Sequence, residues 1–189
     1  IEQNDLDAVI NDQYTNDRIA DIFLNEKLPD YVVGDLRVLV EKLEGPLAVR
    51  SSSLLEDSKT QPFAGIYKTY MLANNHPDPE MRLKELEKAV KFVYASTFSN
   101  EAKAYRKLTP HLPDEEKMAV VIQKVVGRSY AGGARFYPVL AGVVQSYNYY
   151  PVPPLSSEDP IAHMAMGLGK TIVEGRTALR FSPSHPRNL

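Results

Sequence analysis

The sequence predicts an α+β protein, and three features of its pattern support that fold class. Apolar residues recur at helical spacing over 30–43 and over 79–108, so each segment has one face suited to burial. A run of β-branched and apolar residues at Met118–Val126 is typical of a buried strand. Clusters of Gly, Pro and Asn separate these segments and mark turns.

Residues 1–45 are expected to form an N-terminal helical segment. One helix is predicted over 5–25, where apolar residues recur every three or four positions. A second helix is predicted over 30–43, with Asp30 as its N-cap. The Gly45-Pro46 pair that follows cannot continue a helix and is expected to end it.

The middle of the chain is predicted to begin with a strand over 47–50 and a polar loop over 51–62. A second strand is expected over 65–73, before a cluster of turn residues. The long helical pattern of 79–108 is predicted to break near Ser96–Asn100, where small and polar residues gather.

The last third of the chain is predicted to be rich in strands. Met118–Val126 has the composition of a central strand, and 127–135 reads as a loop. Residues 136–147 are expected to form a strand pair or one bulged strand, with Gly142 as the break. After a proline-rich loop, the apolar residues 161–166 suggest a further strand.

Composition narrows the class of protein. A chain of 189 residues fits one domain or two small lobes. The net charge of −2 argues against a general nucleic-acid or membrane-surface binder, which needs a basic excess. The absence of cysteine excludes disulfide bonds, zinc-thiolate sites and thiol nucleophiles, and it fits a cytoplasmic protein. The polar, acidic first residues show no signal peptide pattern. The chain begins with Ile1 rather than Met and stops shortly after the Gly167-Leu-Gly motif, so we expect it to be a piece of a longer protein.

The stretch PLAVRSSSLLEDSKTQPFAGIYKTY, which begins at Pro46, contains the most informative polar side chains. Arg50 follows an apolar run, so we expect a strand end to hold it, and its planar guanidinium suits a phosphate. Taken alone, Arg50 could instead form a structural ion pair with Glu56 or Asp57.

This stretch resembles the ATP-binding domain of the phosphoenolpyruvate synthase and pyruvate phosphate dikinase family, which includes rifampin phosphotransferases. The family pattern is an arginine followed by two serines, an acidic pair, Phe-Ala-Gly and a threonine. The matching residues are Arg50, Ser51, Ser52, Glu56, Asp57, Phe63, Ala64, Gly65 and Thr69. The resemblance implies a partial ATP-grasp-like fold over 46–189, with mixed, mostly antiparallel sheets flanked by helices.

The resemblance also implies roles for individual residues. Arg50 would contact the nucleotide phosphates and offset their charge, as the catalytic side chain of this segment. Gly65 would let the backbone approach the phosphates, and the Thr69 hydroxyl would donate to an anionic oxygen. Ser51 and Ser52 are second choices for the same site, because serines in a turn also cap backbone groups.

A second segment of the resemblance lies in the predicted strand Met118–Val126. Gln123 matches a family position that contacts the nucleotide, and the backbone near Val125 would read the edge of the adenine. From the residues alone, any buried strand has this pattern, and Gln123 could simply point outward.

The segment Gly167-Leu-Gly-Lys170-Thr171 is not a P-loop, because that motif requires a glycine where Met164 stands. The resembling family has a similar Gly-Leu-Gly near its substrate face, but Lys170 departs from the residues usual there. The alternative interpretation is a tight turn that needs Gly167 and Gly169.

The four histidines lack the spacing of metal ligands and the context of the family's phosphorylated histidine. We interpret His76, His111 and His185 as surface loop residues, and His163 as a packed strand residue.

The implied function is the ATP-binding domain of a kinase-type phosphotransferase. It would pass a phosphoryl group from ATP, through a histidine on another domain of the same chain, to pyruvate or a similar acceptor. The implied cofactors are ATP and Mg²⁺, with the metal ligands outside this segment, which is expected to be inactive by itself. Two alternatives stay open: a nucleotide-sensing regulatory module and a non-catalytic scaffold with the same fold.

Overall fold

In the computed structural model, the chain falls into two compact units. They are an N-terminal unit, Ile1–Val125, and a C-terminal unit, Val126–Leu189. The structure describes Val9 and residues 14–53, 66–107, 117–133, 135–173 and 178–187. Within these residues, no helix is long and apolar enough to cross a membrane. Helices and antiparallel sheets are both present, which confirms the predicted α+β class.

The described residues of the N-terminal unit include several helices. They are α2 (Asn16–Asn25), α3 (Asp30–Lys42), α4 (Pro79–Ser96) and α5 (Asn100–Lys107). The helices α2, α3 and α4 have apolar residues at helical spacing, which gives each one buried face. In α5 the buried residues are Ala102 and Arg106. The predicted break of the 79–108 helical pattern near Ser96–Asn100 is confirmed, because α4 and α5 are separate helices.

The sheet of the N-terminal unit has three antiparallel strands in the order β2-β1-β3. Strand β1 (Leu47–Ser53) lies in the middle, between β2 (Tyr70–Leu72) and β3 (Met118–Lys124). The β1–β3 ladder is long, running from Leu47 opposite Lys124 to Ser53 opposite Met118.

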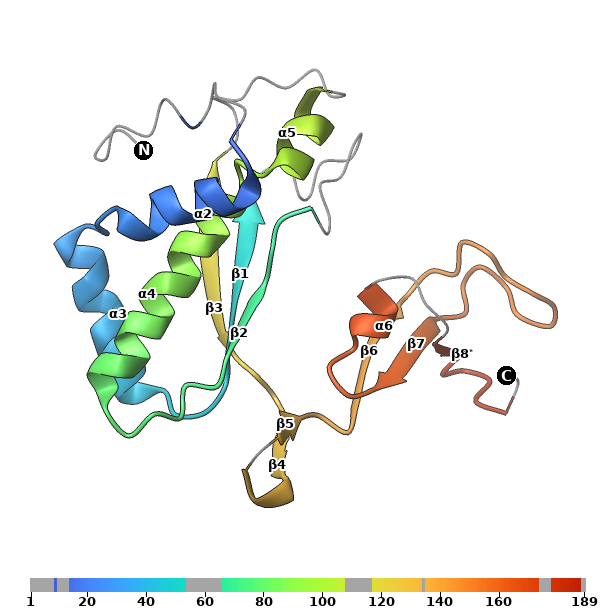
Figure 1. Cartoon of the computed structure of the whole chain (residues 1–189). Helices are drawn as coiled ribbons and strands as arrows, with labels where there is room; N and C mark the ends of the chain where they lie inside the picture. Colours follow the sequence, from blue (N-terminus) through green and yellow to red (C-terminus); the bar gives the residue numbers. More distant parts are fainter. Residues whose placement is uncertain are drawn as a thin grey trace. The chain divides into compact units, whose positions relative to one another are not determined.

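One face of this sheet is covered by helices, and we call it the helix face. Side chains alternate along β1, so Leu47, Val49, Ser51 and Ser53 are buried while Arg50 and Ser52 are exposed. Val49 packs with residues of α3 and α4 in the main core of the unit. Figure 1 shows α3 and α4 lying along the same side of the sheet.

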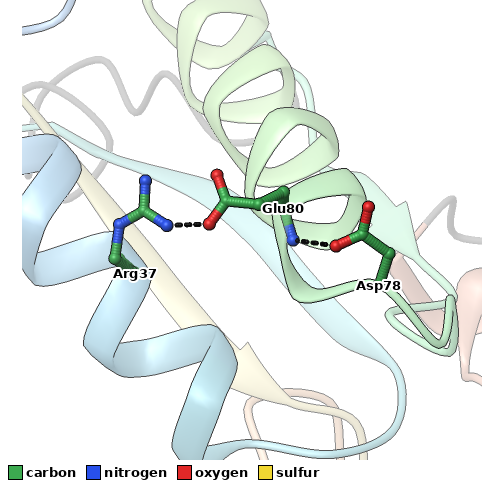
Figure 2. A network of polar contacts seen from close by, with 3 residues as sticks. All are labelled: Arg37, Asp78 and Glu80. Carbon is green, nitrogen blue, oxygen red and sulfur yellow. Dashed lines mark hydrogen bonds and ion pairs between the residues drawn. The ribbon is translucent and has the colours of Figure 1, made fainter.

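A few polar contacts link α3 to α4 and link the segments that connect helices and strands. Arg37 of α3 forms an ion pair with Glu80 of α4, and the Asp78 side chain caps α4 by accepting from the backbone N–H of Glu80, as Figure 2 shows. The buried Asn74 side chain donates from Nδ2 to the carbonyl oxygens of Leu43 and Gly45, at 2.8 and 3.0 Å. These bonds tie the segment after β2 to the connection between α3 and β1.

The described residues of the C-terminal unit form mainly short strands. A hairpin of β4 (Arg128–Tyr130) and β5 (Arg135–Tyr137) precedes a three-stranded antiparallel sheet in the order β6-β7-β8. The strands of that sheet are β6 (Leu140–Gln145), β7 (Ile161–Met166) and β8 (Leu179–Phe181). A single turn of helix, α6 (Lys170–Val173), contacts β7.

Two details of the predicted helices are corrected by the structure. The predicted helix 5–25 is not continuous, because Tyr14 and Thr15 are not helical and the Thr15 hydroxyl instead accepts from the N–H of Arg18 as the N-cap of α2. The N-cap of α3 is Pro29, and Asp30 is the first residue of the helix, where its negative charge suits the helix dipole.

Several predicted strand limits are also wrong. Strand β1 continues to Ser53, because alternate serines can be buried in the sheet, whereas β2 is limited to Tyr70–Leu72. The predicted loop 127–135 contains most of the β4–β5 hairpin. Gly142 does not break a strand but lies inside β6, where an added Cβ would lie 2.6 Å from the carbonyl oxygen of His163.

Candidate functional site

The face of the β2-β1-β3 sheet opposite the helix face carries most of the predicted ligand-binding residues, and we call it the open face. In β1, Ala48, Arg50 and Ser52 point to this side, since their neighbours are buried on the other. Their partners across the ladder in β3 are Gln123, Val121 and Ala119, in that order. Directly paired residues of an antiparallel ladder project from the same face, so these six side chains form one surface.

Arg50 is exposed near the middle of β1, level with Val121. The expectation that a strand end holds it is therefore wrong, because β1 runs three residues further than predicted. Among the described residues, no hydrogen bond or ion pair engages its guanidinium. The alternative partners Glu56 and Asp57 lie outside the described residues.

The two serines beside Arg50 lie on different faces. Ser52 is exposed on the open face, two positions from Arg50, and pairs with Ala119. Ser51 is buried on the helix face and already has interaction partners. The structure therefore brings Ser52, but not Ser51, to the side of the sheet that carries Arg50.

Thr69 is exposed and directly precedes β2. Tyr70 pairs with Val49, so extending the antiparallel register by one residue places Thr69 level with Arg50. Gly65 lies outside the described residues. The threonine thus lies just before β2 and level with the arginine in the neighbouring strand β1, although nineteen positions separate them in the sequence.

Gln123 and Val125 lie at the opposite end of β3 from Met118. Gln123 is exposed on the open face, opposite Ala48. The backbone N–H of Val125 donates to the carbonyl oxygen of Pro46 at 2.9 Å and so continues the ladder beyond β3. This N–H is therefore already engaged, and a ligand at the strand end would have to use other donors.

The apolar residues of the open face were not found from the sequence. Ala119 and Val121 in β3, together with Met71 in β2, lie between or beside the polar residues of this surface. Alternation of side chains along each strand could have shown which residues share a face. Assigning residues of β3 to the same face as Arg50 also requires the register between β1 and β3, which only the folded structure gives.

A hollow of about 500 Å³ exists elsewhere in the N-terminal unit, but its position does not match the predicted residues. Its strand lining consists of Met118, Val120 and Ile122, which project from the helix face of β3. Leu28 and Tyr31, near the start of α3, also line it. This hollow lies behind the sheet, on the side away from Arg50.

The Gly167-Leu-Gly segment forms the tight turn that was the alternative to a ligand loop. Gly167 and Gly169 have φ angles of 80° and 76°, which only glycine adopts without strain. The carbonyl oxygen of Gly169 accepts from the N–H of Ile172 at 2.9 Å as the short helix α6 begins. The positive φ angles explain both glycines without a phosphate.

The described residues of the open face do not fit a magnesium site. They present a guanidinium, a serine hydroxyl and an amide, but no carboxylate among the residues named above, and Mg²⁺ prefers carboxylate oxygens. Over the whole described part of the chain, no three His, Asp or Glu residues gather where they could hold a metal ion.

Comparison with known protein families shows the family of the chain. The family described as pyruvate phosphate dikinase, AMP/ATP-binding domain, matches residues 1–185. Because that match covers nearly all of the 189 residues, the chain belongs to this family of nucleotide-binding domains. The predicted resemblance to the ATP-binding domain of this family is therefore confirmed.

One curated relative shows the scale of the proteins in which such a domain occurs. The chain is 29% identical over 153 residues to a protein of Bacillus subtilis (strain 168) named "Uncharacterized phosphotransferase YvkC". The aligned region is 80% of this chain but 16% of the relative. The chain thus spans about a sixth of the length of the relative that it matches.

Proposed function

We propose that the open face binds ATP, and that Arg50 holds its phosphates. The observation that carries this proposal is the placement of Arg50, Ser52 and Gln123 on one exposed face of a sheet in a chain of the AMP/ATP-binding family. Buried arginines pair with acids, whereas an exposed guanidinium without a described partner is available to a polyanion.

The proposed site separates the two ends of the nucleotide along the strands. Arg50 and Ser52, with Thr69 at the level of Arg50, offer a cation and two hydroxyls for the phosphates. Gln123 lies opposite Ala48, two residues or about 7 Å along β1 from Arg50. That end of the face would take the base, with the amide of Gln123 able to donate and accept at its polar edge.

For the parent protein, we propose phosphoryl transfer from ATP to a histidine on another domain, and from there to pyruvate or a similar acceptor. The support is the family of this chain and the name of the relative, a phosphotransferase about six times as long as the aligned region. Arg50 would stabilise the charge that develops on the transferred phosphoryl group, by positioning and electrostatics and without covalent chemistry.

The proposal is tested by calorimetric titration of the 189-residue chain with ATP, comparing Arg50→Ala with the unmodified protein. Loss of a charge-assisted contact costs about 1.5–3 kcal/mol, so we expect the affinity to fall about 10- to 100-fold with the fold intact. Arg18→Ala is the matched control, because it removes another exposed arginine of the same unit, on helix α2, which packs against α4. Equal affinities for the two variants would reject the assignment of Arg50.

A second experiment separates transfer from mere binding. The parent protein would be incubated with ATP labelled at the β- or γ-phosphate, and the protein examined for an acid-labile, base-stable label. Such a label supports the histidine relay, whereas ATP binding without labelling indicates a nucleotide-sensing module.

A further inference from the structure

A second concave surface lies in the C-terminal unit, on one face of the β6-β7-β8 sheet. It is a pocket of about 460 Å³, lined by residues of all three strands, by Ile172 of α6 and by the segment after β6. The register places Val143, His163 and Arg180 in one row across the sheet, because His163 pairs with both of the others. The row therefore brings a guanidinium and an imidazole side by side in the lining of one pocket.

Arg180 is held in a fixed position at the edge of this pocket. Its Nη2 donates to Oδ1 of Asn148 at 3.1 Å and to the carbonyl oxygen of Tyr150 at 3.0 Å. Within the described part of the chain, these are its hydrogen bonds, so the Nε and Nη1 donors of the planar group remain for another acceptor. A guanidinium that is oriented before a ligand arrives loses little freedom on binding.

Asn148 is the residue that orients Arg180, and its own amide is not fully satisfied. It is 1% exposed, and its Oδ1 accepts from the N–H of Tyr150 at 3.2 Å as well as from Arg180. These two donors fix which end of the amide is the oxygen. The buried Nδ2 then has no acceptor in the described structure, although buried polar groups almost always have one.

The lining of the pocket suits an anion with an apolar body. Among the described residues that line it, none is acidic, and Arg180, His163 and Gln145 offer donors. The apolar side chains of Val143 and Ile161 occupy the same sheet face. This combination of a few convergent polar groups with apolar walls is usual for small-molecule sites.

We propose that this pocket binds a small organic oxyanion, a carboxylate or a phosphate monoester, through the guanidinium of Arg180. His163 donates a further hydrogen bond to the same oxyanion, and the apolar body lies against Val143 and Ile161. Asn148 acts as a positioning residue, because it holds Arg180 and Tyr150 and does not itself need to touch the ligand. All of these residues belong to the C-terminal unit, so the proposal does not depend on the ATP site around Arg50.

The test is a titration of the ¹⁵N-labelled 189-residue chain with inorganic phosphate, phenyl phosphate and benzoate at constant ionic strength, followed by NMR. We expect saturable shifts of the Arg180 side-chain Nε–H signal and of amides near His163, with phenyl phosphate binding at least fivefold tighter than inorganic phosphate. The relative affinities of benzoate and phenyl phosphate then distinguish a carboxylate ligand from a phosphate ester.

Two variants make the test specific. Val143→Glu places a carboxylate in the row of His163 and Arg180 without removing any of the observed hydrogen bonds, and should weaken binding at least tenfold. Val144→Glu is the matched control, because Val144 is the next residue, is likewise exposed and projects from the opposite face of the sheet. Absence of saturable shifts, or equal loss of affinity in both variants, would overturn the proposal. An unchanged titration in Arg50→Ala would show that this pocket is independent of the ATP site.

Discussion

The two units of the chain are stabilised in different ways. Among the described residues, the N-terminal unit has sixteen buried apolar residues, whereas the C-terminal unit has two, Ile161 and Ala162. Exposed large apolar side chains show the reverse distribution, with four in the N-terminal unit and twelve in the C-terminal unit. The N-terminal unit is therefore built around a hydrophobic core, while strand pairing and polar anchors such as Asn148 have a larger share in the C-terminal unit.

This difference has a consequence for function. A rigid core behind the β2-β1-β3 sheet fixes the positions of Arg50, Ser52 and Gln123 without using their side chains for stability. In the C-terminal unit, Asn148 and Arg180 hold the segment after β6 and also line the pocket. A substitution on the open face should therefore change ligand affinity with little effect on the stability of the fold. A substitution of Asn148 or Arg180 in the C-terminal pocket should change both.

The largest effect on stability is expected from Leu86→Ala. Leu86 is 1% exposed in the core between α4 and the sheet, so its truncation should destabilise the N-terminal unit by about 3 kcal/mol through lost burial and a cavity. The matched change Met166→Ala, at a residue that is 82% exposed in the C-terminal unit, should cost less than about 0.5 kcal/mol. Native-state hydrogen exchange of β1 and β7 amides reports the two units separately, and similar costs would contradict the difference between them.

The smallest effect on stability is expected from the Asp159 carboxylate, at the surface of the C-terminal unit. The pKa of Asp159 lies below its usual value, first because its carboxylate accepts from the backbone N–H of Ser156, then from the Ser156 hydroxyl, with His185 nearby. A lowered folded-state pKa means that this group favours folding above the pKa of the unfolded chain. Its contribution is lost as the pH falls through the folded-state pKa.

Ser156→Ala checks this cause directly. It removes the hydroxyl donor at 3.0 Å but keeps the backbone donor at 2.8 Å, so the pKa of Asp159 should rise only part of the way to its usual value. An NMR titration of the Asp159 carboxyl carbon measures the shift. A complete return would show that the backbone bond contributes nothing.

Much of the N-terminal unit could be predicted from the sequence, because its residues follow periodic patterns. Helical spacing located α3, and the small polar residues near Ser96 located the break between α4 and α5. The limits of β1 could not be predicted in this way, since serine ordinarily favours turns and yet Ser51 and Ser53 are buried in the strand. Packing against the rest of the unit determines that these serines belong to the strand, and the local sequence carries no information on that packing.

The sequence indicated residues for a candidate site but not how they are arranged in space. The family pattern indicated Arg50, Ser51 and Ser52 together, and only strand alternation separates the buried Ser51 from the other two. The C-terminal pocket had no signal in the sequence, because Asn148 and Arg180 are thirty-two positions apart. The roles of Gly65, Ser51 and Val125 in nucleotide binding stay predictions, as do those of Arg50, Thr69 and Gln123.

The most direct test of the ATP proposal is to map where ATP binds on the ¹⁵N-labelled 189-residue chain. Amide shift changes on titration with ATP should be saturable and centred on Arg50, Ser52, Ala119 and Gln123, the residues of the open face. Changes centred instead on Leu28 and Tyr31, at the hollow behind the sheet, would contradict the account. So would changes confined to the C-terminal unit, or the absence of any saturable change.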